Sequence, residues 1–525
     1  MRHKLLSLSN RVLFNSKSLL GVYCNHAPLT VNRKMILGYL TFAVLSIKAT
    51  TVWSETFSDD FMFGVATSAY QTEGAWNLTG KGESQWDHYA HKYPEKITDG
   101  SNGDVACDSY NRYQEDISFL EDLGVQFYRF SISWPRILPT GYPHQINWEG
   151  VEFYLNILKI LNATGIEPVV TLYHWDLPQN FNEMGGWSNP LLVDYFAEYS
   201  RLCYRLFGDY VRYWITLNEP ETTCLNGYTY GNFAPGYQLS GIATYYCIYV
   251  HLLAHARAYH IYHDEFFATQ QGKVSMSWVS YWMHPNSESE HDVKAAERIM
   301  QFMIGMYVHP IYIGNWPQET IDIIDKRSEL AGFARSRLPK FTDEEIEYIK
   351  GTADYLGLNY YSTYLVKHAF DVDDLPNITS FNLDVGVSLN IDPSWPTSAA
   401  SWLFDVPWGF RAYINWIGDH YGNPEILITE NGWAGNGESL NDTDRIQYLN
   451  GHLCVVWKAI NEDNRNIIGY TQWSLMDNFE WASGYTEKFG IVHVDFEGNL
   501  TRTPKASYEW FKQVVETKTI DCTGF

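Results

Sequence analysis

Short apolar segments recur eight times along the chain, and this repetition constrains the fold more than any other feature. They are rich in β-branched and aromatic residues and cover residues 62–68, 127–133, 168–173, 213–217, 273–278, 354–359, 425–429 and 468–473. Amphipathic stretches with helical spacing separate them, which is typical of a parallel sheet, and eight such units favour a closed barrel. The sequence therefore predicts an α/β fold, a single (β/α)8 TIM barrel with long βα loops. An open doubly wound sheet is the alternative, but no Gly-rich dinucleotide loop follows the first segment.

Glycines mark the expected ends of three helical stretches, at Gly124, Gly165 and Gly208. Glycine readily adopts the left-handed conformation that commonly follows the last turn of a helix. We therefore expect each of these glycines to cap a helix of the barrel.

Composition excludes several classes of function. The 525 residues include 37 Lys and Arg against 61 Asp and Glu, a net charge of −24 that disfavours nucleic-acid and anionic-membrane partners. An apolar content of 45% with 19% charged residues argues against disorder. Aromatic residues make up 16% of the chain and need either a large core or apolar-faced ligands such as sugars. CxxC and HEXXH motifs are absent from the sequence, so we expect neither a metal nor another cofactor.

The first 54 residues differ from the rest because they contain seven Lys and Arg but no Asp or Glu. Arg33 and Lys34 precede Met35 and an apolar run at 36–47, and small and polar residues follow. This order predicts a secretory signal peptide at 35–54, since the run is shorter than the about 20 residues that span a bilayer. Residues 1–34 are then an upstream extension from a gene model or alternative start, with a transit peptide as the alternative. The remaining residues, 55–525, form the predicted barrel domain.

Export to the secretory pathway lumen or the exterior agrees with five N-x-Ser/Thr sequons. These glycosylation candidates are Asn77, Asn162, Asn377, Asn441 and Asn499. The pairing of the cysteines cannot be read from the sequence. The oligomeric state is open, with a homodimer among the options.

Polar side chains and tryptophans follow most of the predicted strands. The chemistry of a (β/α)8 barrel sits at the carboxyl ends of its strands, so we expect these residues on one rim. In chain order they are Gln71, Arg129, His174, Asn218, Glu219, Asn359, Tyr361, Glu430, Trp473, Glu480 and Trp481.

Glu219 and Glu430 are the natural catalytic pair, because each lies one step beyond an apolar strand. Glycoside hydrolysis needs one carboxyl group to protonate the leaving oxygen and a second to attack the anomeric carbon or activate water. A single Glu after a strand is usually a solvated loop residue or a partner of a helix N-terminus. Two such residues on opposite strands, each beside Asn and near aromatics, favour the catalytic interpretation.

The segments 216–220 (TLNEP) and 428–432 (ITENG) resemble the two signature motifs of glycoside hydrolase family 1, the β-glucosidase family. The resemblance runs from about residue 57 to 515 and includes the segments 61–71, 128–134 and 473–481. Members of this family are retaining enzymes on a (β/α)8 barrel, with the acid/base after strand four and the nucleophile after strand seven. The resemblance implies a retaining β-glucosidase that acts on small-molecule β-glycosides.

The resemblance also implies a role for each matched residue. Glu430 corresponds to the nucleophile and Glu219 to the acid/base, with their carboxyl groups about 5–5.5 Å apart as retention requires. The resemblance places Arg129, Tyr361 and Asn359 around the nucleophile and Asn218 on the sugar 2-hydroxyl. It implies further substrate contacts from Gln71, His174, Glu480, Trp481 and Tyr361. Trp473 would lie beneath the sugar. The alternatives are an internal salt bridge for Arg129, a core histidine for His174 and core packing for each tryptophan.

Two rival functions remain. A thioglucosidase (myrosinase) acting on glucosinolates is the nearer one, because insect-type enzymes keep the acid/base Glu that plant types replace with Gln. Its sulfated aglycone should need a cation, and Lys367 and His368 are the nearby candidates. A catalytically weak glycan-binding relative should have lost one carboxylate, and both are present. Glu480 and Trp481 would exclude a phosphorylated sugar.

The aglycone itself is not fixed by the sequence. Its cleft is expected from the variable βα loops, around residues 224–240, 365–400 and 433–442.

Overall fold

The computed structural model describes residues 54–370, 378–435, 437 and 439–525. The predicted extension at 1–34 and, apart from Ser54, the predicted signal peptide at 35–54 lie outside the described residues, as does Asn377. The described residues belong to one compact unit.

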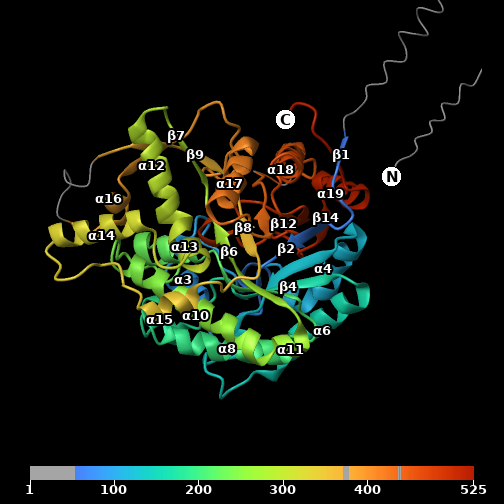
Figure 1. Cartoon of the computed structure of the whole chain (residues 1–525). Coiled ribbons are helices and arrows are strands. Elements are labelled where there is room, and N and C mark those ends of the chain that lie inside the picture. The colour runs from blue at the N-terminus through green and yellow to red at the C-terminus, as the bar shows by residue number, and fades with distance from the viewer. Residues whose placement is uncertain (1–53, 371–377, 436, 438) are drawn as a thin grey trace, which may run out of the picture. The chain divides into compact units, whose positions relative to one another are not determined.

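Eight parallel strands close into a barrel (Figure 1). Each strand pairs with its neighbours in chain order, and the last pairs with the first through Gly469 and Met62. The strands are β2 (Met62–Ala66), β3 (Phe127–Ser131), β4 (Glu167–Tyr173), β5 (Tyr213–Asn218), β6 (Lys273–Val279), β8 (Leu356–Asn359), β11 (Ile426–Asn431) and β12 (Ile467–Trp473). All eight predicted segments are therefore barrel strands, and the TIM-barrel prediction is confirmed.

Helices follow the strands and surround the barrel. The longer ones are α4 (Ser109–Leu123), α6 (Trp148–Thr164), α8 (Leu192–Phe207), α10 (Ala243–Glu265), α12 (Glu290–Met300), α14 (Gln318–Leu330), α17 (Pro407–His420), α18 (Thr443–Asn461) and α19 (Ala506–Thr517). Shorter ones are α2 (Ala69–Thr72), α3 (Gln85–Lys92), α5 (Trp134–Ile137), α7 (Gln179–Asn182), α9 (Pro220–Thr222), α11 (Phe267–Gln270), α13 (Met306–Tyr312), α15 (Asp343–Ile349) and α16 (Phe381–Val385), with π-helical turns η3 (Thr223–Tyr230) and η4 (Gln301–Gly305) and 3₁₀ turns η1 (Pro94–Lys96), η2 (Gly186–Ser188) and η6 (Trp481–Ser483).

Two of the three predicted glycine caps adopt the expected conformation. Gly124 and Gly165 are left-handed, with φ of 68° and 75°. Gly208 differs, because its φ is −65°. A Cβ there would lie 2.1 Å from the amide end of Gln270, so a larger residue would have to displace this side chain, whose Nε2 donates to the Tyr204 carbonyl.

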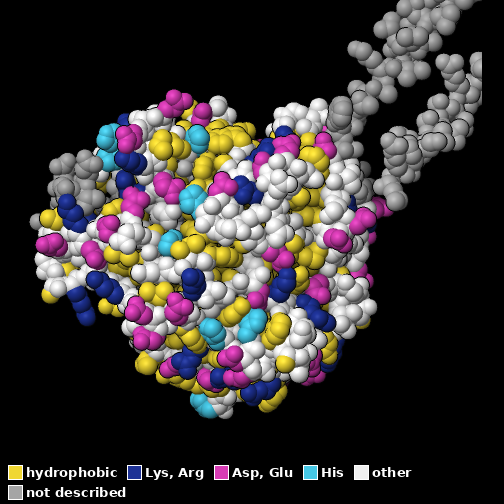
Figure 2. All heavy atoms as spheres, in the orientation of Figure 1, with side chains coloured by type: hydrophobic (Ala, Val, Ile, Leu, Met, Phe, Trp, Pro, Cys, Tyr) yellow, Lys and Arg dark blue, Asp and Glu magenta, His cyan; other side chains and the backbone are white. Residues whose placement is uncertain are grey.

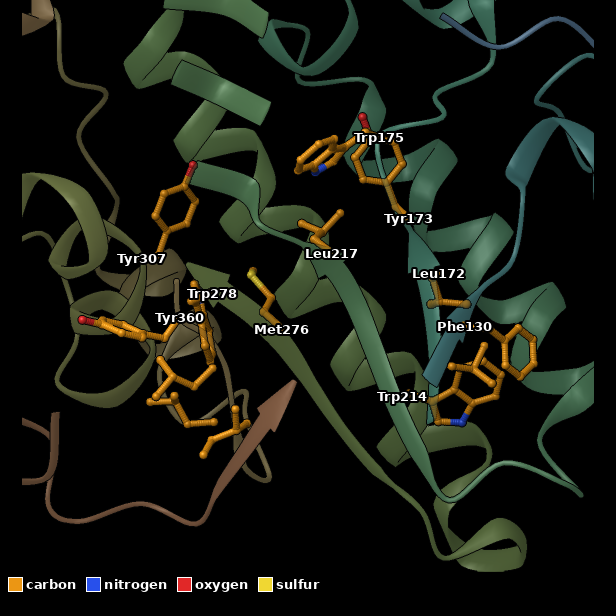
Figure 3. Packing of buried hydrophobic residues seen from close by; sticks show 14 of the residues in the cluster. Phe130, Leu172, Tyr173, Trp175, Trp214, Leu217, Met276, Trp278, Tyr307 and Tyr360 are labelled. Carbon is orange, nitrogen blue, oxygen red and sulfur yellow. The ribbon is translucent and has the colours of Figure 1, made fainter. Parts of the chain in front are cut away.

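Side chains alternate along each strand between the barrel interior and the helices, as the strand period requires. A small apolar cluster fills the interior near the amino ends of the strands and includes Phe127, Val169, Ile215 and Leu427. Two residues further along β3 and β11 the interior becomes polar, and Arg129 donates to the carbonyl of Thr429. Outward-facing residues such as Leu172, Trp214 and Met276 join the large cluster between barrel and helices (Figure 3). The alternation thus places a polar layer directly above an apolar floor.

Long loops after β6 and β8 form an accessory sheet. Its strands are β7 (Trp282–Pro285), β9 (Thr363–His368) and β10 (Val387–Asn390), in the order β10-β9-β7. Two antiparallel pairs complete the described strands, β1 (Ser54–Thr56) with β15 (Thr519–Asp521) and β13 (Val492–Val494) with β14 (Arg502–Pro504). Acidic and basic side chains are interspersed over the face shown in Figure 2.

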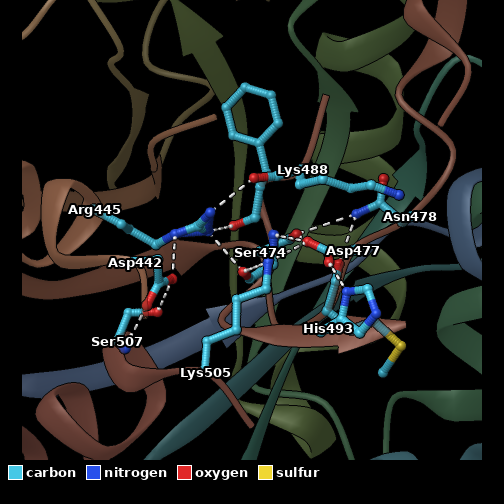
Figure 4. A network of polar contacts seen from close by, with 12 residues as sticks. Asp442, Arg445, Ser474, Asp477, Asn478, Lys488, His493, Lys505 and Ser507 are labelled. Atoms are coloured by element: carbon cyan, nitrogen blue, oxygen red, sulfur yellow. Dashed lines mark hydrogen bonds and ion pairs between the residues drawn. The ribbon is translucent and has the colours of Figure 1, made fainter. Parts of the chain in front are cut away.

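A buried polar network holds the loop after β12 (Figure 4). Asp477 accepts from Lys505 Nζ at 2.7 Å and from the Gly490 amide at 3.0 Å. Arg445 pairs with Asp442 and donates to three successive carbonyls of the loop, those of Lys488, Phe489 and Gly490. The network fixes both ends of the segment that carries several predicted site residues.

Replacing Lys505 with Met should destabilise the fold strongly, because it leaves the fully buried Asp477 without its cation. Breaking a buried pair by removing one partner costs about 3–5 kcal/mol of the free energy of unfolding. Lys512→Met is the matched control on the same segment, since the Lys512–Asp122 pair is exposed and should contribute little to the free energy of unfolding. Urea unfolding of both variants measures the difference, and equal midpoints would contradict the role of the network.

Candidate active site

A cavity of about 540 Å³ opens at the carboxyl ends of the barrel strands. Eight of the predicted site residues line it: His174, Asn218, Glu219, Tyr361, Glu430, Trp473, Glu480 and Trp481. The other three, Gln71, Arg129 and Asn359, are buried and hydrogen-bond to residues of this wall. The barrel therefore brings all eleven together at one rim.

Glu430 lies at the end of β11 and is 3% exposed. Arg129 Nη1 lies 2.6 Å from its Oε1, and the Tyr361 hydroxyl donates to its Oε2 at 2.6 Å. A guanidinium and a phenol thus hold one carboxylate oxygen each, and charge-assisted hydrogen bonds of this kind are the strong ones. The carboxylate is fixed in position on the cavity wall.

Glu219 follows β5 and has a left-handed backbone, with φ of 42°. Its Oε1 accepts from Asn359 Nδ2 at 2.7 Å, and its Oε2 accepts from the Thr222 hydroxyl at 3.0 Å. Burial, and after it repulsion from Glu430, raises the pKa of Glu219 to about 8. This carboxyl is therefore protonated at neutral pH.

Asn359 was expected to support Glu430 and lies next to it in the register of β8 and β11, but its side chain donates to Glu219. Its Oδ1 accepts from the hydroxyls of Ser277 and Thr429, at 2.8 and 2.7 Å. Because these two donors occupy the oxygen, the Nδ2 group is turned towards Glu219. Glu430 is held by the other two expected residues, Arg129 and Tyr361.

Asn218 forms hydrogen bonds with both Arg129 and His174. Its Oδ1 accepts from Arg129 Nη2 at 2.5 Å, and its Nδ2 lies 3.0 Å from His174 Nε2. An amide NH₂ only donates, so Nε2 accepts and the ring proton is on Nδ1. Burial lowers the pKa of His174 well below its usual range, which agrees with a neutral ring.

The end of β12 and the loop that follows it supply an aromatic wall with a carboxyl group. The rings of Trp473 and Trp481 each lie 5.8 Å from the His174 ring, at interplanar angles of 22° and 17°. A Cβ on Gly432 would lie 1.8 Å from the Trp473 carbonyl oxygen, so a larger residue would displace this strand end.

Gln71 and Glu480 form the polar end of this wall. Gln71 Nε2 donates to Glu480 Oε2 at 3.2 Å and to Asn478 Oδ1 at 2.9 Å. Burial, together with the nearby carboxylates of which Glu487 contributes most, raises the pKa of Glu480 well above its usual range. Amide and carboxyl groups in this arrangement suit vicinal hydroxyl groups.

Several residues of the cavity wall were not predicted from the sequence, because they lie in loops away from the strand ends. They are Thr222, Trp402, Glu487 and Phe489. Of these residues, only Thr222 could have been predicted from the sequence, since it lies three positions after Glu219. The loop 224–240 contributes as expected, whereas the contribution expected from 365–400 comes from the adjoining residues 401 and 402. Among the described residues of 433–442, none lines the cavity.

The cation candidates do not reach this cavity. Its described lining contains neither Lys nor Arg, and Lys367 is an exposed residue of β9. His368, at the end of the same strand, is also outside the lining.

The sequon asparagines and the cysteines bear on the predicted export. The sequon residues Asn77, Asn162, Asn441 and Asn499 are all exposed. Disulfides join Cys224 to Cys247 and Cys454 to Cys522. In the part of the chain that the structure describes, none of the helices has the length and apolar character needed to cross a bilayer.

A (β/α)8 barrel with two glutamates on one cavity at its strand ends, beside amide groups and indole rings, defines a carbohydrate-active enzyme. The comparison with protein families agrees, because the model of glycosyl hydrolase family 1 matches residues 53–520. The chain belongs to this family and is a glycosidase.

Known relatives cover most of the chain. Myrosinase 1 of Brevicoryne brassicae is 45% identical over 464 residues, 88% of this chain and 98% of that protein. Beta-glucosidase 4 of Oryza sativa subsp. japonica is 43% identical over 470 residues, 88% of this chain and 95% of that protein. Among solved structures, an aphid myrosinase matches with a TM-score of 0.84 and 44% identity over 88% of this chain and 100% of that one. The rice Os3BGlu6 β-glucosidase matches with a TM-score of 0.82 and 38% identity over 87% and 98%.

Titration of Glu219 should show an apparent pKa of about 8. Difference infrared spectroscopy between the wild type and Glu219→Gln isolates its carboxyl band. Thr222→Val should raise this pKa further, because the carboxylate loses a hydrogen-bond donor. Thr223→Val, the next residue along, is the matched control and should leave it unchanged. A titration near the ordinary Glu value of about 4.3 would contradict the burial argument.

Proposed function

We propose that the protein is a retaining β-glycosidase that hydrolyses O-linked β-glucosides, with Glu430 as nucleophile and Glu219 as acid/base. The observation that carries the proposal is the contrast between the two carboxyl groups of one cavity. Glu430 is paired with Arg129, whereas Glu219 is protonated up to about pH 8. One group is therefore equipped to attack and the other to donate a proton.

In the first step Glu430 attacks the anomeric carbon and Glu219 gives its proton to the leaving oxygen, so the C–O bond breaks and a glycosyl-enzyme forms. In the second step the Glu219 carboxylate takes a proton from water. The hydroxide adds to the anomeric carbon and the bond to Glu430 breaks. A separation of about 5–5.5 Å between the carboxyl groups is part of this proposal. Above about pH 8 the first step loses its proton donor.

Residues of the same cavity wall would make the contacts with the glycone. In this proposal Asn218 binds the sugar 2-hydroxyl, and Gln71, His174 and Glu480 offer amide, imidazole and carboxyl groups to the others. Trp473 and Trp481 provide flat apolar surface for the C–H face of the ring. The described lining of the cavity offers four carboxyl groups but neither Lys nor Arg, so it would give a phosphorylated sugar no cation.

A thioglucosidase acting on glucosinolates is the second candidate. The observation in its favour is the similarity to Myrosinase 1 of Brevicoryne brassicae and to the solved aphid myrosinase. The described cavity lining contains neither Lys nor Arg for a sulfated aglycone, which favours O-glucosides. A catalytically weak glycan-binding role is disfavoured, because both carboxyl groups are present and oriented by donors.

Export and glycosylation are also part of the proposal. They are supported by the exposed sequon residues and by two disulfides, which persist in oxidising compartments.

Hydrolysis of nitrophenyl β-glucoside tests the proposed function. The wild type should release nitrophenol, and Glu430→Gln should lose several orders of magnitude in kcat/KM because the nucleophile is gone. Glu487→Gln is the matched control, since it changes another carboxyl group of the same cavity without touching the pair. The panel includes a glucosinolate, and faster turnover of it than of any O-glucoside would favour the thioglucosidase. Unchanged turnover in Glu430→Gln would overturn the mechanism.

A further inference from the structure

The phenol of Tyr361 reaches Glu430 from a short connection between two strands. Its hydroxyl donates to Glu430 Oε2 at 2.6 Å. The chain leaves β8 at Asn359 and enters β9 at Thr363, so Tyr361 lies beyond the end of the barrel strand. One backbone bond, from the Tyr360 amide to the Glu430 carbonyl, continues the pairing of the strands. Beyond this bond, side chains from other elements hold the connection.

Asn431, the residue after Glu430, holds the first carbonyl of the connection. Its Nδ2 donates to the Tyr360 carbonyl at 2.7 Å and to the Tyr448 hydroxyl at 3.0 Å, which uses both protons of the amide. Its Oδ1 accepts from the Tyr470 hydroxyl at 2.6 Å. A carbonyl only accepts, so the amide nitrogen faces the Tyr360 carbonyl. The fully buried side chain therefore has one orientation.

Tyr448 holds the second carbonyl, that of Tyr361 itself. It belongs to α18 and is fully buried, and its hydroxyl donates to this carbonyl at 2.8 Å. The single hydroxyl proton is used there, so the hydroxyl accepts from Asn431. The Tyr448 ring packs against the rings of His452 and Trp433, at centroid distances of 3.8 and 4.9 Å. This packing fixes the place of the hydroxyl group.

Tyr448 is not among the described residues that line the active-site cavity. Its link to the reaction is the backbone of Tyr361. The contact at the other end of Tyr361 is sensitive to displacement, because hydrogen bonds between two oxygens extend only to about 3.0 Å. A misplacement of about 1 Å at a reacting group costs up to about a hundred-fold in rate. A small shift of the connection is therefore enough to misalign Glu430.

We propose that Tyr448 is a positioning residue of the active site. Together with Asn431 it holds the backbone of Tyr361, so that the phenol meets the carboxylate that attacks the sugar. The inference rests on the proposed function, since it concerns the alignment of the proposed nucleophile. It assigns part of this alignment to a helix that surrounds the barrel.

Tyr448→Phe removes the hydroxyl group and keeps the ring. The value of kcat/KM for nitrophenyl β-glucoside should fall by about ten- to a hundred-fold, because the phenol no longer aligns Glu430. Competitive inhibition by glucose should be unchanged, since Tyr448 lies outside the described cavity lining. Tyr199→Phe is the matched control. This fully buried tyrosine of α8 also donates to a strand carbonyl at 2.8 Å, that of Leu172 on β4, and its loss should leave kcat/KM unchanged.

A double-mutant cycle with Tyr361→Phe separates positioning from general destabilisation. Once the Tyr361 hydroxyl is gone, Tyr448→Phe should cost less than about three-fold in kcat/KM, because the group through which it acts is missing. An equal loss in both backgrounds would overturn the inference, since independent sites lose the same factor in either background. Tyr470→Phe, which frees the Asn431 oxygen, is the milder variant in case Tyr448→Phe does not fold. It should show the same dependence on Tyr361 with a smaller loss.

Crystal structures of the wild type and Tyr448→Phe distinguish this inference from the proposed function. In the variant, the distance from the Tyr361 hydroxyl to Glu430 Oε2 should exceed about 3.0 Å. A displaced phenol, in a protein whose wild type hydrolyses no β-glucoside, would support the structural link and overturn the proposed function. Hydrolysis by the wild type, together with an unmoved phenol or an unchanged kcat/KM in Tyr448→Phe, would overturn the positioning role alone.

Discussion

The contact between Arg129 and Glu430 inside the barrel is the interaction on which the rest of the site depends. A guanidinium that is 1% exposed has to be compensated, because an unpaired buried charge is costly. Arg129 meets this need with Glu430, the Asn218 amide oxygen and the Thr429 carbonyl. The same contacts set the positions of the carboxylate and the amide on the cavity wall. The apolar cluster around Phe127 and Leu427 lies beneath this layer and separates it from the other end of the barrel.

The second carboxyl group differs because its surroundings lack a direct cation. Glu219 is held by the neutral donors Asn359 and Thr222, so burial and the charge of Glu430 dominate its pKa. Two glutamates of one cavity thereby have different neighbours, a buried cation for Glu430 and neutral donors for Glu219. The barrel supplies this difference by placing each at the end of a separate strand, β5 and β11.

Much of this arrangement could be predicted from the sequence, because strand ends follow from local patterns. The eight apolar segments gave the barrel strands, and the polar residues that follow them lie on one rim as expected. The partner of Asn359 could not be predicted, since it depends on which hydroxyl groups of β6 and β11 occupy its oxygen. Trp402, Phe489 and the disulfides depend on how long loops pack against each other. Gly208 shows the same limit, because the side chain that crowds this glycine belongs to Gln270, 62 residues further along the chain.

Covalent trapping with a 2-fluoro β-glucoside that carries a good leaving group tests the central claim most directly. The fluorine slows both steps, and the activated leaving group restores the first, so the glycosyl-enzyme accumulates. The account predicts that the intact mass rises by one fluoroglycosyl group and that peptide mapping places this group on Glu430. A label on any other residue, or hydrolysis of ordinary β-glucosides with inversion at the anomeric carbon, would contradict it.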